Sequence, residues 1–444
     1  MSIDRFTSDD KEYKYKILVY PNITFQKDLE KDSYVVVLGN IIKEINKIRT
    51  DLHWTILSPE LIPSLQFDNT DQLIVPQMSY PNSMRMAFPF KEVFKAINWK
   101  HTDYDIVYSH LPEHTGQLKN LLFNTTDICP TIIGYTHWTE FKEITNYEYE
   151  VGLAFNIIGL LQMEKCGINT QAQKELVLKN AKEHFNDNVV KQLDDILKPQ
   201  YLGWETPNYE QQTTDKNIVV YNHRPHTYKN YPWFLEQMDK LWEQRQDFEV
   251  WVPLAESKER EYITIDKYDR FGYFSKLSSC KVGVCCKQKY EGWAISATDG
   301  MSVGVPYMFS DDGSYHELAD DAGIYYNDSN TFLDSMNKVL DDKEFRNEYS
   351  EKSLQRFQDS KWDKQILKIN DMFQGAIDNL NTIKRTESYD KIVDFIRTKK
   401  SVTKNEILLH MGWGVRIGFT SYRNRLRNET DIKFTKNRYE VINK

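Results

Sequence analysis

Two successive series of short apolar runs, each run separated from the next by a helical pattern, constrain this chain more than any other feature. Apolar residues recur at helical spacing over 34–48 and 233–244, for example. Strands that alternate with helices form parallel sheets covered by those helices. The sequence therefore predicts an α/β fold, with strands at 15–20, 53–57, 72–75, 105–108 and 130–135, then at 217–221, 248–252, 281–285 and 306–309.

A length of 444 residues is too great for one hydrophobic core. Two βα series in tandem favour two Rossmann-like domains facing a cleft, which we place at residues 1–205 and 206–375. The helical pattern over 346–373 predicts a final helix for the second domain. Such a helix is able to cross back to the first domain. A linker at 376–388 then leads to a small domain at 389–444.

The bulk properties exclude several classes of protein. No run of eighteen apolar residues occurs, so no integral membrane segment is expected. The first residues are polar and lack the apolar centre of a signal peptide. The five cysteines form an odd number without a framework spacing, and Cys285-Cys286 lies inside an apolar run. These features predict a cytoplasmic protein with reduced thiols and no structural metal site.

The net charge of −8 conceals a strong asymmetry along the chain. Residues 384–444 contain 15 Lys and Arg against 7 Asp and Glu, a net charge of +8, so residues 1–383 carry −16. A basic segment on an acidic body indicates a polyanionic partner for that segment alone.

The basic segment has a compact pattern of its own. Helices are expected at 389–397, 403–411 and 419–427, the second with Thr403 or Ser401 as its N-cap, and residues 432–442 alternate around Lys436-Asn437 as a hairpin would. Three helices followed by a hairpin indicate a winged helix-turn-helix. Its expected DNA contacts are Arg416, Arg423, Arg425, Arg427, Lys433, Lys436 and Arg438. The alternative is a solvated basic face that contacts proteins.

The most specific segment of the chain is residues 291–306, EGWAISATDGMSVGVP, in which Glu291 and Asp299 are separated by seven residues. This segment resembles the acidic motif of retaining glycosyltransferases of the GT-B fold, the superfamily of glycogen synthases and lipopolysaccharide glycosyltransferases. The resemblance implies that Glu291 binds hydroxyls of a donor sugar and that Asp299 binds the nucleotide ribose. It also places Gly292, Trp293 and Ala294 at the donor.

Simple chemistry agrees with these roles. A carboxylate accepts two hydroxyl hydrogen bonds and suits a vicinal diol, and amides at a helix start suit a phosphate. The family usually has Glu at the second position, so Asp299 is one methylene shorter and loses reach. The competing interpretation is a surface loop with two incidental acids. Against it, Gly304-Val305-Pro306 and His316-Glu317-Leu318 follow at distances similar to those in the family.

A second match lies after the predicted strand 217–221, where Arg224 is followed five residues later by Lys229. By resemblance, both contact the donor diphosphate. Arginine offers bidentate geometry and lysine a point charge, and together they offset the charge that builds on a departing nucleoside diphosphate. The resemblance therefore implies no metal and no cofactor beyond the nucleotide-sugar co-substrate.

In the first domain, His137 and, more weakly, His110 follow predicted strands and resemble the strand-end histidines of the family. His137 would lie near the sugar; the alternative for it is a loop histidine bonded to backbone. Asp103-Tyr104-Asp105 matches the Asp-x-Asp motif of metal-binding sites. Its position directly before a predicted buried strand favours a turn instead. The turn after the first strand lacks the glycines common in the family, which leaves Lys27 and Asp28 as guesses for acceptor contacts.

Together these features predict a retaining, metal-independent glycosyltransferase that moves a sugar, most commonly from UDP in this superfamily, to a hydroxymethylated pyrimidine in DNA. Such an enzyme would serve phage DNA modification in the host cytoplasm. The alternative is a bacterial enzyme of surface polysaccharide, teichoic acid or glycolipid synthesis, with a basic tail that binds membrane or a partner. A third possibility is a DNA-binding regulator on a decayed transferase body. The motifs encode neither the sugar nor the oligomeric state.

Overall fold

The computed structural model describes residues 13–23, 29, 32–76, 78, 87–97, 104–125, 130–136, 147–288, 292–382, 387–411, 426, 429, 431–435 and 438–442. The chain divides into two compact units. The first comprises residues 1–167, 187–197 and 368–444, and the second comprises residues 168–186 and 198–367. The chain returns to the first unit at residue 368, inside the helix Trp362–Thr382. The domain boundaries at 205 and 375 stay predictions.

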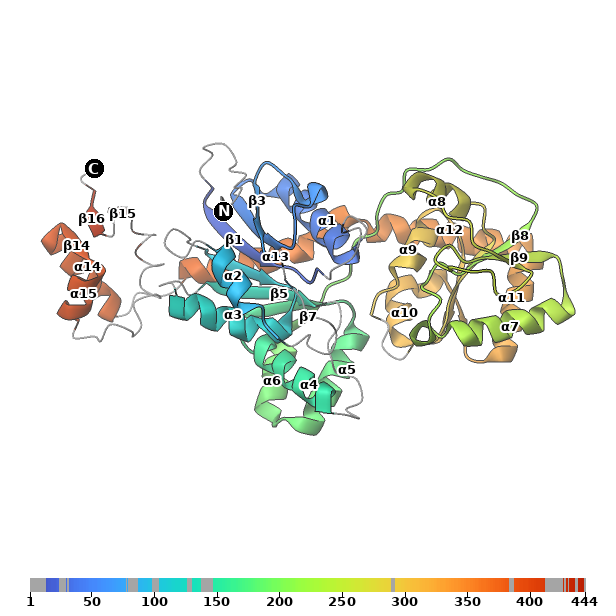
Figure 1. The fold of residues 1–444 in the computed structure, drawn as a ribbon, viewed down its shortest axis with the longest axis horizontal. Helices are drawn as coiled ribbons and strands as arrows, with labels where there is room; N and C mark the ends of the chain where they lie inside the picture. Colours follow the sequence, from blue (N-terminus) through green and yellow to red (C-terminus); the bar gives the residue numbers. More distant parts are fainter. Residues whose placement is uncertain are drawn as a thin grey trace. The chain divides into compact units, whose positions relative to one another are not determined.

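The described part of the first unit is built on a parallel sheet (Figure 1). The strand order of this sheet is β3-β2-β1-β4-β5-β6-β7. The strands are β1 (Tyr15–Tyr20), β2 (Leu52–Ser58), β3 (Thr70–Ile74), β4 (Ile106–Ser109), β5 (Thr131–Thr136), β6 (Lys165–Ile168) and β7 (Leu197–Pro199). The helices between them are α1 (Ser33–Ile48), α2 (Phe90–Ala96), α3 (Pro112–Thr125), α4 (Tyr147–Leu160), α5 (Gln171–His184) and α6 (Asp187–Ile196). Of these, α5 is counted with the second unit.

Local chemistry explains the framework of this sheet. The four residues Ile17–Tyr20 of β1 are fully buried, as a central strand covered on both faces requires. Helix α1 begins where the Asp32 carboxylate accepts a hydrogen bond from the Tyr34 amide, and its apolar stripe is buried. The long helix α13 (Trp362–Thr382) returns to the same core, where Phe373 packs edge-on against Trp54 and Tyr108.

The second unit holds a second parallel sheet, with strand order β10-β9-β8-β11-β12-β13. Its strands are β8 (Asn217–Val220), β9 (Phe248–Trp251), β10 (Ile263–Thr264), β11 (Val282–Cys285), β12 (Tyr307–Ser310) and β13 (Gly323–Tyr326). Two groups of helices surround it (Figure 1): α7 packs with α11, and α8 and α12 pack with α9. The helices are α7 (Tyr231–Gln244), α8 (Arg270–Leu277), α9 (Ile295–Ser302), α10 (Gly313–Ala319), α11 (Ser329–Asp341) and α12 (Lys343–Ser360).

The C-terminal segment has a small core of its own around Ile396, Val402 and Ile407. Its described elements are α14 (Glu387–Lys399), β14 (Ser401–Thr403), α15 (Lys404–His410), β15 (Ile432–Thr435) and β16 (Arg438–Val441). The antiparallel sheet has the order β14-β16-β15, so the predicted hairpin is present. Thr403 caps α15 in a capping box with Glu406. The predicted helix 419–427 lies outside the described residues except for Leu426.

The helical pattern over 346–373 is not one helix, because α12 ends at Ser360 and α13 begins at Trp362. The reason is a contact from far along the chain: the Trp204 amide donates to the Ser360 carbonyl at 2.9 Å. Gly203 also lies so close to Trp362 that an added Cβ would be 2.4 Å from its ring. Strand β6 and helices α3 to α6 were not predicted.

Candidate functional site

The strand order of the second sheet fixes where a ligand can bind. The chain runs from β8 outward to β9 and then returns to place β11 on the other side of β8. In open parallel sheets, ligands bind beyond the carboxyl ends of the strands where the order reverses in this way. Asn222 and His223 follow β8, and Cys285 ends β11, so these residues lie at that reversal point.

Asn222 ties the end of β8 to three other elements. Its side-chain amide donates to the Tyr273 hydroxyl at 2.9 Å and to the Ser296 carbonyl at 2.7 Å. The Tyr307 hydroxyl donates in turn to the Asn222 oxygen at 3.0 Å. Because Asn222 is only 4% exposed, this satisfied network holds α8, α9 and β12 around one side chain.

His223 makes a second connection to the start of α9. Its ring lies 2.8 Å from the Ser296 hydroxyl through Nδ1 and 3.1 Å from the Cys285 sulfur through Nε2. The ring is buried. Asn222 and His223 therefore hold the main chain and the side chain of Ser296, the second residue of α9.

Helix α9 begins without a side-chain cap at Ala294. The Ile295 amide already donates to the Trp293 carbonyl at 3.2 Å and the Ala297 amide to the Ala294 carbonyl at 2.9 Å. An anion at this helix start would therefore rest on the Ser296 amide and on the helix dipole, which favours negative charge there. The preceding segment is firmly packed: Trp293 stacks on Tyr201 with ring centroids 5.4 Å apart. A Cβ added to Gly292 would be 2.3 Å from the Gln173 amide nitrogen, so Gln173 would have to shift to admit a larger residue there.

The two predicted diphosphate contacts lie in the loop that follows His223. Arg224 is exposed, and its guanidinium forms no ion pair with any residue that the structure describes. Lys229 is half-buried at the end of a short 3₁₀ helix (Thr227–Lys229), and its carbonyl accepts a hydrogen bond from the Tyr221 hydroxyl at 2.9 Å. Both residues therefore come from the loop at the carboxyl end of β8, beside the residues that hold α9.

Asp299, the predicted ribose contact, is buried on α9 and already engaged. Arg270 donates from Nη1 to Oδ2 and from Nη2 to Oδ1, each at 3.3 Å, and the Tyr273 hydroxyl donates to Oδ2 at 3.3 Å. Arg270 also binds Glu205 at 2.7 Å. Burial raises the pKa of Asp299 to about 6, and the nearby Glu205 charge adds to the rise, against the opposing charge of Arg270.

This pKa makes the stability of the protein depend on pH. An unfolded aspartate has a pKa of about 3.9, so between about pH 4 and pH 6 the folded chain holds a proton that the unfolded chain has lost. The favourable contribution is complete below that range and is lost as the pH rises through 6. We expect the unfolding free energy of the wild type to fall by about 2–3 kcal/mol relative to Asp299→Asn over this interval. Urea unfolding of both proteins at a series of pH values measures it, and a difference that stays constant or grows with pH contradicts it.

Several predicted site residues lie outside the described residues, namely Glu291, His137, Arg416, Arg423, Arg425, Arg427 and Lys436. Lys433 is exposed on β15. Arg438 is engaged within the C-terminal segment, where it donates to the Ser401 hydroxyl at 2.8 Å and to the Ser401 carbonyl at 3.1 Å.

His110 is enclosed by the rings of Tyr108 and Tyr135, and burial lowers its pKa to about 3. The neutral His110 ring is therefore part of the core.

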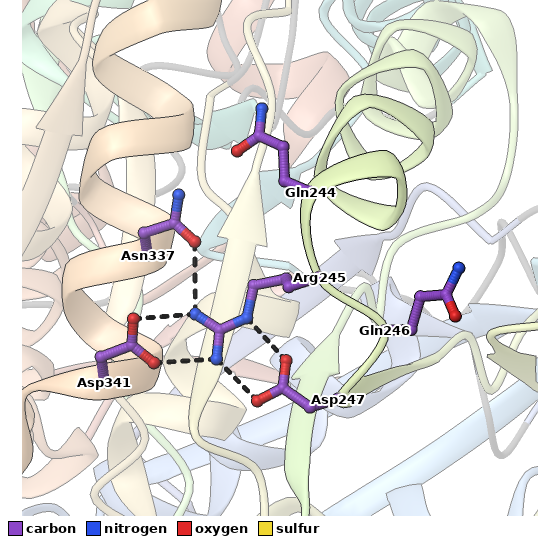
Figure 2. A pocket seen from close by; sticks show the side chains of 6 residues that line it. All are labelled: Gln244, Arg245, Gln246, Asp247, Asn337 and Asp341. Atoms are coloured by element: carbon purple, nitrogen blue, oxygen red, sulfur yellow. Dashed lines mark hydrogen bonds and ion pairs between the residues drawn. The ribbon is translucent and has the colours of Figure 1, made fainter.

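A surface pocket elsewhere on the second unit has a different character (Figure 2). It surrounds Arg245, whose guanidinium pairs with Asp247 at 2.7 Å and Asp341 at 2.8 Å and binds Asn337 at 3.2 Å. Asp247 immediately precedes β9, so the pocket lies at the amino ends of the strands. Its cation is already neutralised, and it lies at the opposite end of the sheet from the reversal point.

Asn222, His223, Arg270 and Tyr273 were not singled out from the sequence, although they organise this site. One signal was available: two polar residues, Asn222 and His223, directly follow the apolar strand 217–221.

Among the described residues, no helix has the length and apolarity needed to cross a membrane. Within the same residues, no three His, Cys, Asp or Glu side chains gather in a metal-binding arrangement.

No model of a known protein family matches the chain, and no curated protein sequence matches it significantly. Solved structures do match. Sucrose-phosphate synthase from Thermosynechococcus elongatus aligns with a TM-score of 0.64 at 12% identity, over 82% of this chain and all of that one. HepE from Anabaena, in complex with UDP and glucose, aligns with a TM-score of 0.60 at 10% identity, over 82% and 100% of the two chains. Trehalose 6-phosphate synthase from Burkholderia multivorans aligns with a TM-score of 0.57 at 9% identity, over 83% and 99%.

Proposed function

We propose that the chain is a retaining, metal-independent glycosyltransferase that transfers a sugar from a UDP-sugar to hydroxymethylated pyrimidine bases in DNA. Its fold matches that of solved GT-B glycosyltransferases and agrees with the predicted α/β architecture of two parallel sheets. HepE, which shares the fold, was solved with UDP and glucose, and this supports a UDP-sugar as the donor.

The proposal of a nucleotide-sugar donor rests on the groups that meet at the reversal point of the second sheet. The exposed Arg224 and the half-buried Lys229 lie in the loop after β8, and the uncapped start of α9 is held beside that loop through Ser296. Two cations and a helix amino end suit a diphosphate, and both stabilise the negative charge of the leaving nucleotide. Glu291 directly precedes Gly292 and is proposed to bind the hydroxyls of the sugar.

Two cations at the diphosphate make a metal ion unnecessary for neutralising it, which is the basis for proposing metal independence. Retention is proposed from the resemblance of residues 291–306 to the motif of retaining enzymes. In such a reaction the departing phosphate oxygen accepts the acceptor proton on the same face of the sugar.

The proposal that DNA is the acceptor rests on the C-terminal segment. Its described elements follow the order helix, strand, helix and hairpin, with the sheet order β14-β16-β15, which is compatible with a winged helix. The segment from 384 to 444 carries a net charge of +8 on a body of −16. A basic module of this kind gives sequence-independent affinity for the phosphates of DNA. Because Arg438 is engaged by Ser401, the proposed contacts centre on Lys433 and Lys436 and on the arginines at 416, 423, 425 and 427.

A transfer assay tests the acceptor. Labelled UDP-glucose and a panel of other UDP-sugars are supplied with plain DNA, with DNA containing 5-hydroxymethylcytosine or 5-hydroxymethyluracil, and with EDTA. The proposal expects label only in hydroxymethylated DNA, unaffected by EDTA. Replacing Arg423, Arg425 and Arg427 by alanine should lower DNA labelling at about 200 mM salt while leaving donor hydrolysis unchanged, since each lost phosphate contact reduces the salt dependence of binding by about one. Donor hydrolysis without label in any DNA contradicts the DNA acceptor and redirects the search to glycans and lipids.

A further inference from the structure

The carboxylate of Asp299 has little capacity left for a ligand. Its side chain is 10% exposed, and its two oxygens accept three hydrogen bonds, two from Arg270 and one from Tyr273. One lone pair of Oδ1 remains for a single hydroxyl, so a vicinal diol that donated two hydrogen bonds to Asp299 would have to displace one of these donors and weaken the contact with Arg270.

The groups that face solvent at this place are Arg270 and Glu205. The Arg270 side chain is 52% exposed and that of Glu205 is 39% exposed, and the two are joined by a 2.7 Å ion pair. The guanidinium lies over the ring of Phe274, with its central carbon 4.3 Å from the ring centroid. With Asp299, Glu205 and Phe274 all in contact with it, the planar fork of Arg270 is held in one orientation.

This exposed pair lies beside the proposed diphosphate site. Arg270 is the first residue of α8, and Tyr273 on the same helix binds the Asn222 amide that also holds α9. The carboxylates of Glu205 and Asp299, both ionised, and the guanidinium of Arg270 together carry a net charge of −1. This cluster therefore favours a neutral hydroxylated group over a phosphate. The exposed Glu205 carboxylate accepts hydrogen bonds from a diol, and Arg270 has N–H groups left to donate.

We propose that Glu205 and Arg270, in place of Asp299, recognise the ribose hydroxyls of the nucleoside diphosphate, with Asp299 acting as a positioning residue that orients Arg270. The shorter Asp at the second acidic position is then matched by an arginine that reaches outward from it. This assignment rests on the proposed use of a UDP-sugar. It predicts that affinity depends on the ribose hydroxyls through Glu205 and Arg270.

The test is calorimetric binding of UDP and of 2′-deoxyuridine diphosphate to the full-length protein. We expect the wild type to bind UDP at least about tenfold more tightly than the deoxy compound. Glu205→Gln and Arg270→Ala should each remove most of that discrimination. Arg270→Lys, which keeps the charge and loses the planar fork, should also lose it. Asp299→Asn keeps only one of the two oxygens that accept from Arg270, so it should lower the discrimination in part and less than Glu205→Gln does. The control Arg260→Ala should match the wild type, since Arg260 pairs with Asp239 elsewhere on the same unit.

The outcomes separate the two levels of the argument. A wild type that binds neither nucleotide overturns the proposed donor and this assignment with it. A wild type that binds UDP well but does not discriminate, or whose discrimination survives both Glu205→Gln and Arg270→Lys, overturns this assignment alone. Loss of discrimination in Asp299→Asn with retention in Glu205→Gln returns the ribose contact to Asp299.

Discussion

Replacing Arg224 by alanine should lower kcat for sugar transfer by about 100- to 1000-fold, with a comparable loss for Lys229→Ala. Preorganised charges that face the departing group are worth this much in sites of this type. The exposed guanidinium of Arg224 has no ion-pair partner among the described residues, so its removal leaves no buried charge behind and should not unfold the protein. Initial rates of UDP release from a UDP-sugar measure the effect.

The matched control for these variants is Lys216→Ala. Lys216 is an exposed lysine of the same unit, and it pairs with Glu249 near the start of β8, at the opposite end of that strand. It should leave kcat within about twofold of the wild type, since exposed ion pairs contribute little. If Arg224→Ala and Lys216→Ala behave alike, the loop after β8 does not hold the diphosphate.

Among the glycine-to-alanine substitutions in the described fold, Gly159→Ala should be the most damaging. We expect it to lower the unfolding free energy by about 3 kcal/mol or more. Gly159 lies in α4 against the start of α3, and a Cβ there would be 1.6 Å from the Pro112 carbonyl oxygen. A backbone atom cannot move aside as the end of a side chain can. The two helices would therefore have to separate.

The control is Gly375→Ala in α13, where nothing lies within 4 Å of an added Cβ. Alanine is the better helix former, so this variant should gain about 0.5–1 kcal/mol. Thermal unfolding of the three proteins measures both effects. Equal shifts for the two glycines would show that α3 and α4 are not packed as closely as described.

The alternation of strands and helices was enough to predict the α/β class and the parallel sheets, because that pattern is written locally in the sequence. The described strands β8, β9, β11 and β12 correspond to four predicted ones. The break between α12 and α13 could not be predicted in this way. It depends on Trp204, whose amide reaches Ser360 from a distant part of the chain and leaves no mark on the local periodicity.

Sequence alone could nominate residues of the candidate site only where a motif lies in one continuous segment. The spacing of Arg224 and Lys229 could be found from sequence because both residues belong to one loop. Arg270 could not, since its partners Glu205 and Asp299 come from distant segments and meet only in the fold. Arg438 was predicted as a DNA contact from its charge and its place in the predicted hairpin, and its bonds to Ser401 could be found only from the pairing of β14 with β16.

Release of UDP from a panel of UDP-sugars, measured for the wild type and for Glu291→Ala, shows whether the chain is a glycosyltransferase that acts through residues 291–306. We expect the wild type to release UDP from at least one UDP-sugar, and Glu291→Ala to reduce that release by at least about 100-fold while binding DNA as the wild type does. No release from any UDP-sugar, or an undiminished rate in Glu291→Ala, would contradict the assignment of this chain as a glycosyltransferase acting through the 291–306 segment.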